Sequence, residues 1–179
     1  MKGNLIITSG ENEGKLNATF DYIMPDTLVI QFRDVLGRKQ ALMSLAGENF
    51  ELWMQRENRK LGREEIPDEF SLFVLKTLKL DQIRQLFLGL PLVSRDSSQA
   101  VTTFLGPSGL PERVEIFNAP GELSTLFIYS EFSLEKDIFL PSALQILDLN
   151  KGVDLKIKFY HFSMEYFNLS SHKKRGEIE

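Results

Sequence analysis

The stretch LNATFDYIMPDTLVIQFRDVLGRKQALMSLAGENFELWM, residues 16–54, alternates apolar and polar side chains with a period of two residues. Because successive side chains of a β-strand point to opposite faces of a sheet, this alternation is typical of strands with one buried face. Turn-forming residues at Pro25-Asp26, 33–39 and Gly47-Glu48 separate the apolar runs. Such short connections join antiparallel neighbours. We therefore predict an antiparallel β-meander over residues 4–56.

The middle of the chain changes from strand to helix periodicity. One short helix is predicted after Pro67, a residue that suits the first helical turn, with an apolar face within residues 70–77. A second helix is predicted from Asp81, a good N-cap, to Gly89, a residue that commonly ends helices. We expect both helices to belong to the same domain as the strands.

Period-two alternation returns from about residue 99 and is clearest over residues 153–161, where aliphatic and aromatic side chains alternate with lysines. Strands, two helices and further strands follow one another without a linker. We predict a mainly β (α+β) domain over residues 1–170, with one curved antiparallel sheet and short helices that cover its apolar concave face. The polar tail 171–179 is expected to be frayed.

Composition limits the function classes. The 179 residues carry a net charge of −4, which gives no electrostatic support for nucleic-acid binding. Cysteine is absent, so no disulfide, thiolate metal site or cysteine nucleophile can form. No signal-peptide pattern opens the chain, and its apolar runs are far shorter than the ~20 residues that cross a bilayer. Taken alone, these features predict a soluble chain.

The sequence contains no pattern typical of catalysis. HExxH, GxSxG and glycine-rich phosphate loops are all missing, and the two histidines are His161 and His172. His161 is expected on the apolar face of its strand, as a core or cavity-edge residue. We therefore expect no enzymatic activity, no metal and no cofactor.

One turn combines charge with exposed apolar character. Residues 33–39 read RDVLGRK, so Val35 and Leu36 stand among charged neighbours. This aliphatic pair either folds back over the edge of the sheet or forms an apolar finger that touches a membrane or an acyl chain. The spacing alone leaves both alternatives open.

The stretch LKLDQIRQLFLGLP, residues 78–91, resembles the LR-x-W-x-x-G-x-P helix signature of LolB-type outer-membrane lipoprotein receptors. Ile83-Arg84 stands for LR, Phe87 replaces the tryptophan, and residues 89–91 close the motif. The segments 3–5, 18–20 and 35–37 follow the order of the family's first strands and its PLG loop. Residues 140–146, LPSALQI, are similar to a P-x-x-I-x-I strand of the broader LolA/LolB-like group.

The resemblance implies an unclosed antiparallel half-barrel with helices over its open face and an apolar cavity for lipoprotein acyl chains. Family members accept lipoproteins from a periplasmic carrier and release them into the inner leaflet of the outer membrane, without a cofactor. The loop leucine of the family inserts into the membrane, and its match here is Leu36, flanked by Val35 and Gly37. The chain departs from the pattern in lacking a lipidated cysteine and in carrying Val35 for the loop proline.

The expected location is the periplasmic face of the outer membrane, and the expected oligomeric state is a monomer. The dry faces of the predicted strands and helices define the residues expected to line the cavity. They are Phe20, Tyr22, Ile30, Phe32, Met43, Leu52, Phe73, Phe87, Leu155, Ile157 and Phe159.

Three functions remain open from the sequence. The first is a non-enzymatic protein that accepts acylated lipoproteins and helps to insert them into a membrane. The second is a soluble carrier of a small hydrophobic ligand or lipid. The third is a structural envelope lipoprotein whose own side chains fill its core.

Overall fold

The computed structural model describes residues 2–9, 12–23, 26–73, 78–92, 100–119, 122–135 and 138–161. The predicted tail 171–179 and the side chains of both histidines lie outside what is described. The elements in chain order are β1 Lys2–Ser9, β2 Asn12–Ile23, β3 Thr27–Arg33, β4 Lys39–Ala46, β5 Asn49–Met54, β6 Arg59–Leu61, η1 Arg63–Glu65, η2 Asp68–Phe73, α1 Leu80–Phe87, β7 Ala100–Leu105, β8 Pro111–Ala119, β9 Glu122–Glu135, β10 Ile138–Asp148 and β11 Val153–His161.

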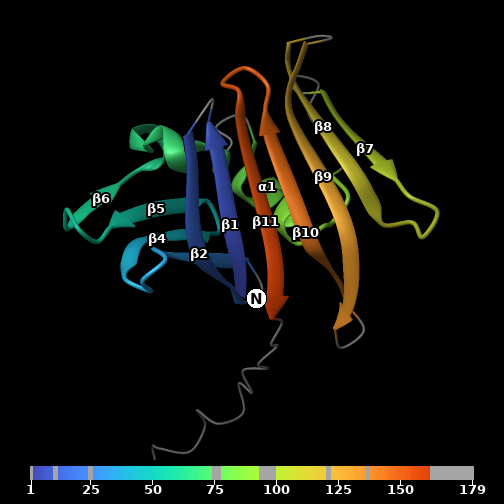
Figure 1. Cartoon of the computed structure of the whole chain (residues 1–179). Coiled ribbons are helices and arrows are strands. Elements are labelled where there is room, and N and C mark those ends of the chain that lie inside the picture. The colour runs from blue at the N-terminus through green and yellow to red at the C-terminus, as the bar shows by residue number, and fades with distance from the viewer. Residues whose placement is uncertain are drawn as a thin grey trace, which may run out of the picture.

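All eleven strands form one antiparallel sheet in the order β6-β5-β4-β3-β2-β1-β11-β10-β9-β8-β7. Strands β1–β6 and strands β7–β11 each pair in chain order, and β1 pairs with β11, which places Leu5 opposite Ile157. This pairing joins the two meanders, and β6 and β7 remain as edges, so the sheet is not closed into a barrel. Figure 1 shows the curved sheet with α1 against one face. The prediction of an unclosed antiparallel half-barrel is confirmed.

The period-two pattern decides which face of the sheet is buried. Buried and less buried residues alternate along the whole of β3 and along β4 from Gln40 onward. The buried faces of both meanders and of α1 contribute to a single hydrophobic cluster. Burying such a side chain stabilises the fold by roughly 1.5–3 kcal/mol. The apolar alternation therefore specifies the register of each strand, because a shift by one residue would turn its apolar face to solvent.

The helix α1 ends where the sequence predicts but begins slightly earlier. Lys79 is the N-cap and its backbone N–H donates to Gln82 Oε1 at 2.9 Å, so Asp81 lies inside the first turn instead of capping it. At the other end, Leu90 N–H donates to Gln85 O at 2.9 Å and Gly89 adopts a φ of +65°. These are features of a Schellman motif, which satisfies the last carbonyls of the helix.

A short helix follows Pro67, as predicted, and it is a 3₁₀ helix. Residues 68–73 form a 3₁₀ helix that begins with a hydrogen bond from Phe70 N–H to Pro67 O at 3.0 Å, and residues 74–77 lie outside the described parts. The i→i+3 bonding eclipses side chains three apart, and it directs Phe70 and Phe73 to the same ring of Phe32. Among the described residues, no helix has the length and apolar character needed to cross a membrane.

Candidate functional site

The turn between β3 and β4 projects two aliphatic side chains into solvent. Val35 is 69% exposed and Leu36 is 74% exposed, and Gly37 beside them is exposed too. The alternative that this pair folds back over the edge of the sheet is therefore wrong. The exposed pair contributes little to the core, which leaves its side chains available for contact with another molecule.

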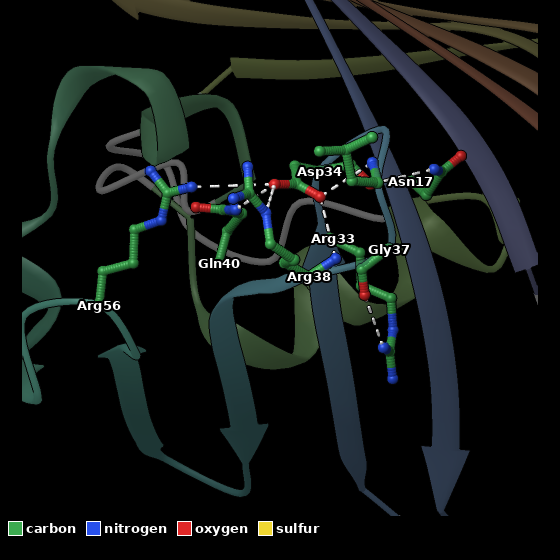
Figure 2. Close-up of polar contacts among 8 residues, drawn as sticks. Asn17, Arg33, Asp34, Gly37, Arg38, Gln40 and Arg56 are labelled. Carbon is green, nitrogen blue, oxygen red and sulfur yellow. Dashed lines mark hydrogen bonds and ion pairs between the residues drawn. The ribbon is translucent and has the colours of Figure 1, made fainter.

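The carboxylate of Asp34 organises this turn (Figure 2). Its Oδ1 accepts hydrogen bonds from the backbone N–H groups of Leu36 at 3.0 Å and Arg38 at 2.9 Å. The backbone adds a bond from Gly37 N–H to Asp34 O at 2.9 Å and one from Asp34 N–H to Arg38 O at 3.0 Å. The backbone amides on both sides of the tip are thus hydrogen-bonded. The side chain of Leu36 takes no part in these hydrogen bonds and remains exposed.

The second carboxylate oxygen joins this turn to the next hairpin. Asp34 Oδ2 accepts from Arg38 Nε at 2.7 Å and from Gln40 Nε2 at 3.0 Å, and it lies 3.8 Å from the guanidinium of Arg56 between β5 and β6. Desolvation opposes ionisation of Asp34, but the hydrogen bonds and charge of Arg38, with the Leu36 amide, hold its pKa below the ordinary value. Asp34 is therefore a carboxylate at neutral pH and fixes both turns.

Gly37 supplies a backbone conformation that other residues rarely adopt. Its φ is +79°, in the left-handed region, and a Cβ added there would meet nothing within 4 Å. The constraint at this position is therefore conformational and not steric crowding. Its carbonyl accepts from Arg33 Nη1 at 3.0 Å, which holds the guanidinium beside the tip.

The structure buries the residues that the sequence places around an apolar cavity. Ten of the eleven are at most 3% exposed and belong to one cluster, and Tyr22 is partly buried against it. The ten are Phe20, Ile30, Phe32, Met43, Leu52, Phe73, Phe87, Leu155, Ile157 and Phe159. A lined cavity and a filled core both require this burial.

The aromatic members of this set contact one another. Phe20 lies 5.1 Å from Phe159 and 5.9 Å from Phe87 between ring centroids. Phe73 stacks on Phe87 at 5.9 Å with an interplanar angle of 6°, and it meets Phe32 edge-on at 4.9 Å. These distances are those of paired rings in packed interiors. At these points the space between α1, η2 and the sheet is filled by the protein's own rings.

Two hollows lie outside these aromatic contacts, although Tyr129, Leu144 and Ile157 of the hydrophobic cluster contribute to their linings. An open groove of about 830 Å³ is lined by the β7–β8 hairpin and β9, and it includes Phe104, over whose ring the guanidinium of Arg113 lies at 4.1 Å. A smaller hollow of about 330 Å³ lies over β9, β10 and β11. Of the predicted cavity residues, only Ile157 lines either of these two hollows.

Two buried polar side chains attach α1 to the sheet: Arg84, which belongs to the helix signature, and Tyr129, which no sequence pattern indicated. Arg84 is 7% exposed and its Nη1 donates to Gly47 O at 2.9 Å. Tyr129 donates from its hydroxyl to Leu86 O at 2.8 Å, and burial raises its pKa. The signal for Arg84 is its place on the apolar stripe of the helix, between Leu80 and Phe87. Tyr129 carries no such signal, because its partner is distant in the chain.

The described residues contain no group of three or more His, Asp or Glu that could hold a metal ion. The turn presents two aliphatic side chains among cations, and the apolar cluster provides apolar surface beneath a helix. Both features are suited to contact and binding.

The sequence matches no family model and no curated protein. Solved structures do match. A domain described as an outer membrane lipoprotein-sorting protein from Vibrio parahaemolyticus superposes with a TM-score of 0.61 at 11% identity, over 88% of this chain and 80% of that one. A LolA superfamily protein from Nitrosomonas europaea gives 0.56 at 10% identity, over 90% and 86%.

A third similar structure, a DUF1329 family protein from Desulfovibrio piger, gives a TM-score of 0.57 at 13% identity and covers 94% of this chain and 88% of its own. Identities this low establish the fold and not the activity. The chain has the half-barrel fold of LolA-type proteins.

Proposed function

We propose that this protein binds acyl chains of lipoproteins and delivers them to a membrane through the Val35–Leu36 turn. The observation that carries the proposal is the exposure of that aliphatic pair on a turn held by Asp34. The LolA-type fold supports it, since one of the similar structures is described as a lipoprotein-sorting domain. The reaction needs no cofactor and breaks no covalent bond.

In this proposal, acyl chains bind between α1 and the sheet. The aromatic cluster presents rings from both sides of that space, with Phe73 and Phe87 on the helical side and Phe20 and Phe32 on the sheet side. Each buried methylene contributes about 0.8 kcal/mol, so three fully enclosed chains would bind almost irreversibly. A space already filled by side chains must be opened on binding, and that cost lowers the affinity enough to allow release.

The proposed place of action is the periplasmic side of the outer membrane, with a periplasmic lipoprotein carrier as donor and the protein acting as a monomer. Leu36 would enter the acyl region of the inner leaflet while the polar backbone of the turn stays bonded to Asp34. The hydrogen bonds of the tip backbone are made to other groups of the same turn. Insertion of the Leu36 side chain into the bilayer therefore leaves these backbone groups paired.

The test is transfer of a fluorescent triacylated lipoprotein from the protein to liposomes, with wild type compared with Leu36→Glu. We expect normal folding and normal cargo binding but strongly slowed release, because a carboxylate opposes entry into the bilayer. Leu149→Glu is the matched control, because Leu149 is a 50% exposed leucine in the turn between β10 and β11. That turn lies at the top of Figure 1, whereas the light-blue turn between β3 and β4 lies at the lower left.

Transfer by Leu36→Glu at wild-type speed would contradict delivery through this turn and favour a soluble carrier. Failure of the wild type to bind the cargo at all would favour the structural alternative, in which the core is filled permanently.

A further inference from the structure

Four basic residues lie on the turn of the exposed aliphatic pair or on the turn next to it. Arg33, Arg38 and Lys39 belong to the same turn and its strand ends, and Arg56 comes from the neighbouring turn between β5 and β6. We call these four residues the basic collar. The whole chain carries a net charge of −4, so the collar is a positive region on an acidic protein.

Asp34 does not neutralise the collar. Its one carboxylate is shared between Arg38 at 2.7 Å and Arg56 at 3.8 Å, and both arginine side chains remain 63% exposed. Arg33 donates to two uncharged oxygens, Gly37 O at 3.0 Å and Gln31 Oε1 at 2.6 Å. Most of the positive charge around the tip is therefore available to an external anion.

The size of the apolar tip shows why the charge matters. Val35 and Leu36 together offer less apolar surface than one myristoyl chain, and a single myristoyl chain binds membranes only marginally and reversibly. Stable membrane contact requires a second signal, of which a basic patch is the common example. Figure 2 shows three members of the collar, Arg33, Arg38 and Arg56, on the turns around Asp34. If the tip enters the acyl region, these cations would face the lipid headgroups.

We propose that the basic collar binds the anionic headgroups of a lipid bilayer, so that the Val35–Leu36 turn engages anionic membranes selectively. This inference rests on the proposed function in using the same turn as the membrane contact. The inference adds to the proposed function the kind of membrane that the turn would bind, namely one with anionic headgroups. Each arginine or lysine near an anionic surface strengthens binding about fivefold, and the attraction weakens as salt shortens the Debye length from ~10 Å at 0.1 M to ~3 Å at 1 M.

The experiment is vesicle flotation of the whole chain without cargo. Vesicles of phosphatidylcholine alone are compared with vesicles in which phosphatidylglycerol replaces part of it, at low and at high salt. We expect wild type to prefer the anionic vesicles and to lose that preference at high salt. The double variant Lys39→Gln/Arg56→Gln should lose about 25-fold in partitioning to anionic vesicles, from about fivefold per cation, and nothing on neutral vesicles.

The matched control is Lys156→Gln/Lys158→Gln, which removes the same charge from two exposed lysines of β11, one of them paired with Asp154 at 3.3 Å. It should partition as wild type does, and equal melting temperatures verify that both variants are folded. Inorganic phosphate at matched ionic strength should not release the protein. Release by phosphate would mean that the collar takes free anions, and it would overturn the inference.

Equal binding of wild type to neutral and anionic vesicles, or an equal loss in the control variant, would also overturn it. The proposed function fails differently. Lipoprotein transfer by Leu36→Glu at wild-type speed, together with a preference of the wild type for anionic vesicles in flotation, would show that delivery through the turn is wrong. The proposal that the collar binds anionic headgroups would then be supported. If transfer by Leu36→Glu stops while the collar variant floats as wild type does, only the collar is wrong.

Discussion

At the scale of single residues, Phe87 of α1 contacts aromatic rings of both η2 and the sheet. It is 1% exposed, stacks on Phe73 and contacts Phe20. In the resemblance to LolB-type receptors it stands at a tryptophan position, and the structure gives this ring a packing role. The same residue would border the acyl chains of the proposed cargo.

Phe87→Ala is expected to lower the free energy of unfolding by about 3–5 kcal/mol, because it removes a fully packed ring and leaves a cavity. Urea unfolding measures this. A loss well under ~2 kcal/mol would instead indicate that the ring borders empty space or that the site collapses easily. Leu90→Ala, which truncates a 42% exposed side chain just beyond the helix, is the control and should cost much less.

Asp34 makes the turn sensitive to acid. Its folded pKa is lowered from the ordinary 3.8, so the ionised carboxylate contributes stability above about pH 4, and that contribution is lost as the pH falls through the lowered pKa. We expect the amide chemical shifts of Leu36 and Arg38 to titrate together with the Asp34 carboxyl below its usual range. NMR titration measures this, and Asp34→Asn should abolish it. A midpoint at or above the ordinary value would contradict the hydrogen-bond pattern.

At the scale of elements, α1 is attached to both meanders. Arg84 reaches the carbonyl of Gly47 in the β4–β5 turn, and Tyr129 of β9 reaches the carbonyl of Leu86. The helix therefore bridges parts of the sheet that are far apart in the strand order. These two hydrogen bonds oppose movement of α1 away from the sheet.

Arg84→Met keeps an apolar stem of similar length but removes the charged donor, and we expect it to lower the free energy of unfolding by about 1.5–3 kcal/mol. Tyr129→Phe should cost less, about 1 kcal/mol, because Leu86 O also accepts from Gly89 N–H at 3.1 Å and keeps a partner. Urea unfolding compares them. If Tyr129→Phe proved the costlier change, the hydroxyl and not the guanidinium would be the main polar attachment of α1.

At the scale of the whole molecule, the apolar cluster runs through both meanders and the helix without interruption. The pairing of β1 with β11 continues the sheet across the centre. One continuous core with one continuous sheet predicts that the two halves unfold together.

Trp53 in β5 is the single tryptophan of the chain and reports on the β3–β6 end of the sheet, whereas far-UV circular dichroism reports on all strands. We expect the two signals to change at the same urea concentration. A tryptophan transition at lower urea would show that the N-terminal meander unfolds by itself, and acyl binding would then be expected to involve that separation.

The local features of this protein can be predicted from its residue patterns. Period-two alternation predicts the N-terminal meander and the buried face of each strand, since burial and side-chain parity are linked residue by residue. Gly89 predicts the end of α1, because few other residues adopt its positive φ. The charged turn with Val35 and Leu36 is visible too, as an alternative between two conformations.

Features that depend on contacts between distant segments could not be predicted in this way and are seen in the fold alone. The pairing of β1 with β11, the bridge from Arg84 to Gly47 and the approach of Arg56 to Asp34 each join residues that no local pattern relates. Residues 68–73 form a 3₁₀ helix that places Phe70 and Phe73 against Phe32, a residue of a distant strand. Local patterns report which face of an element is apolar, whereas partners across the fold depend on how the sheet curves and brings its parts together.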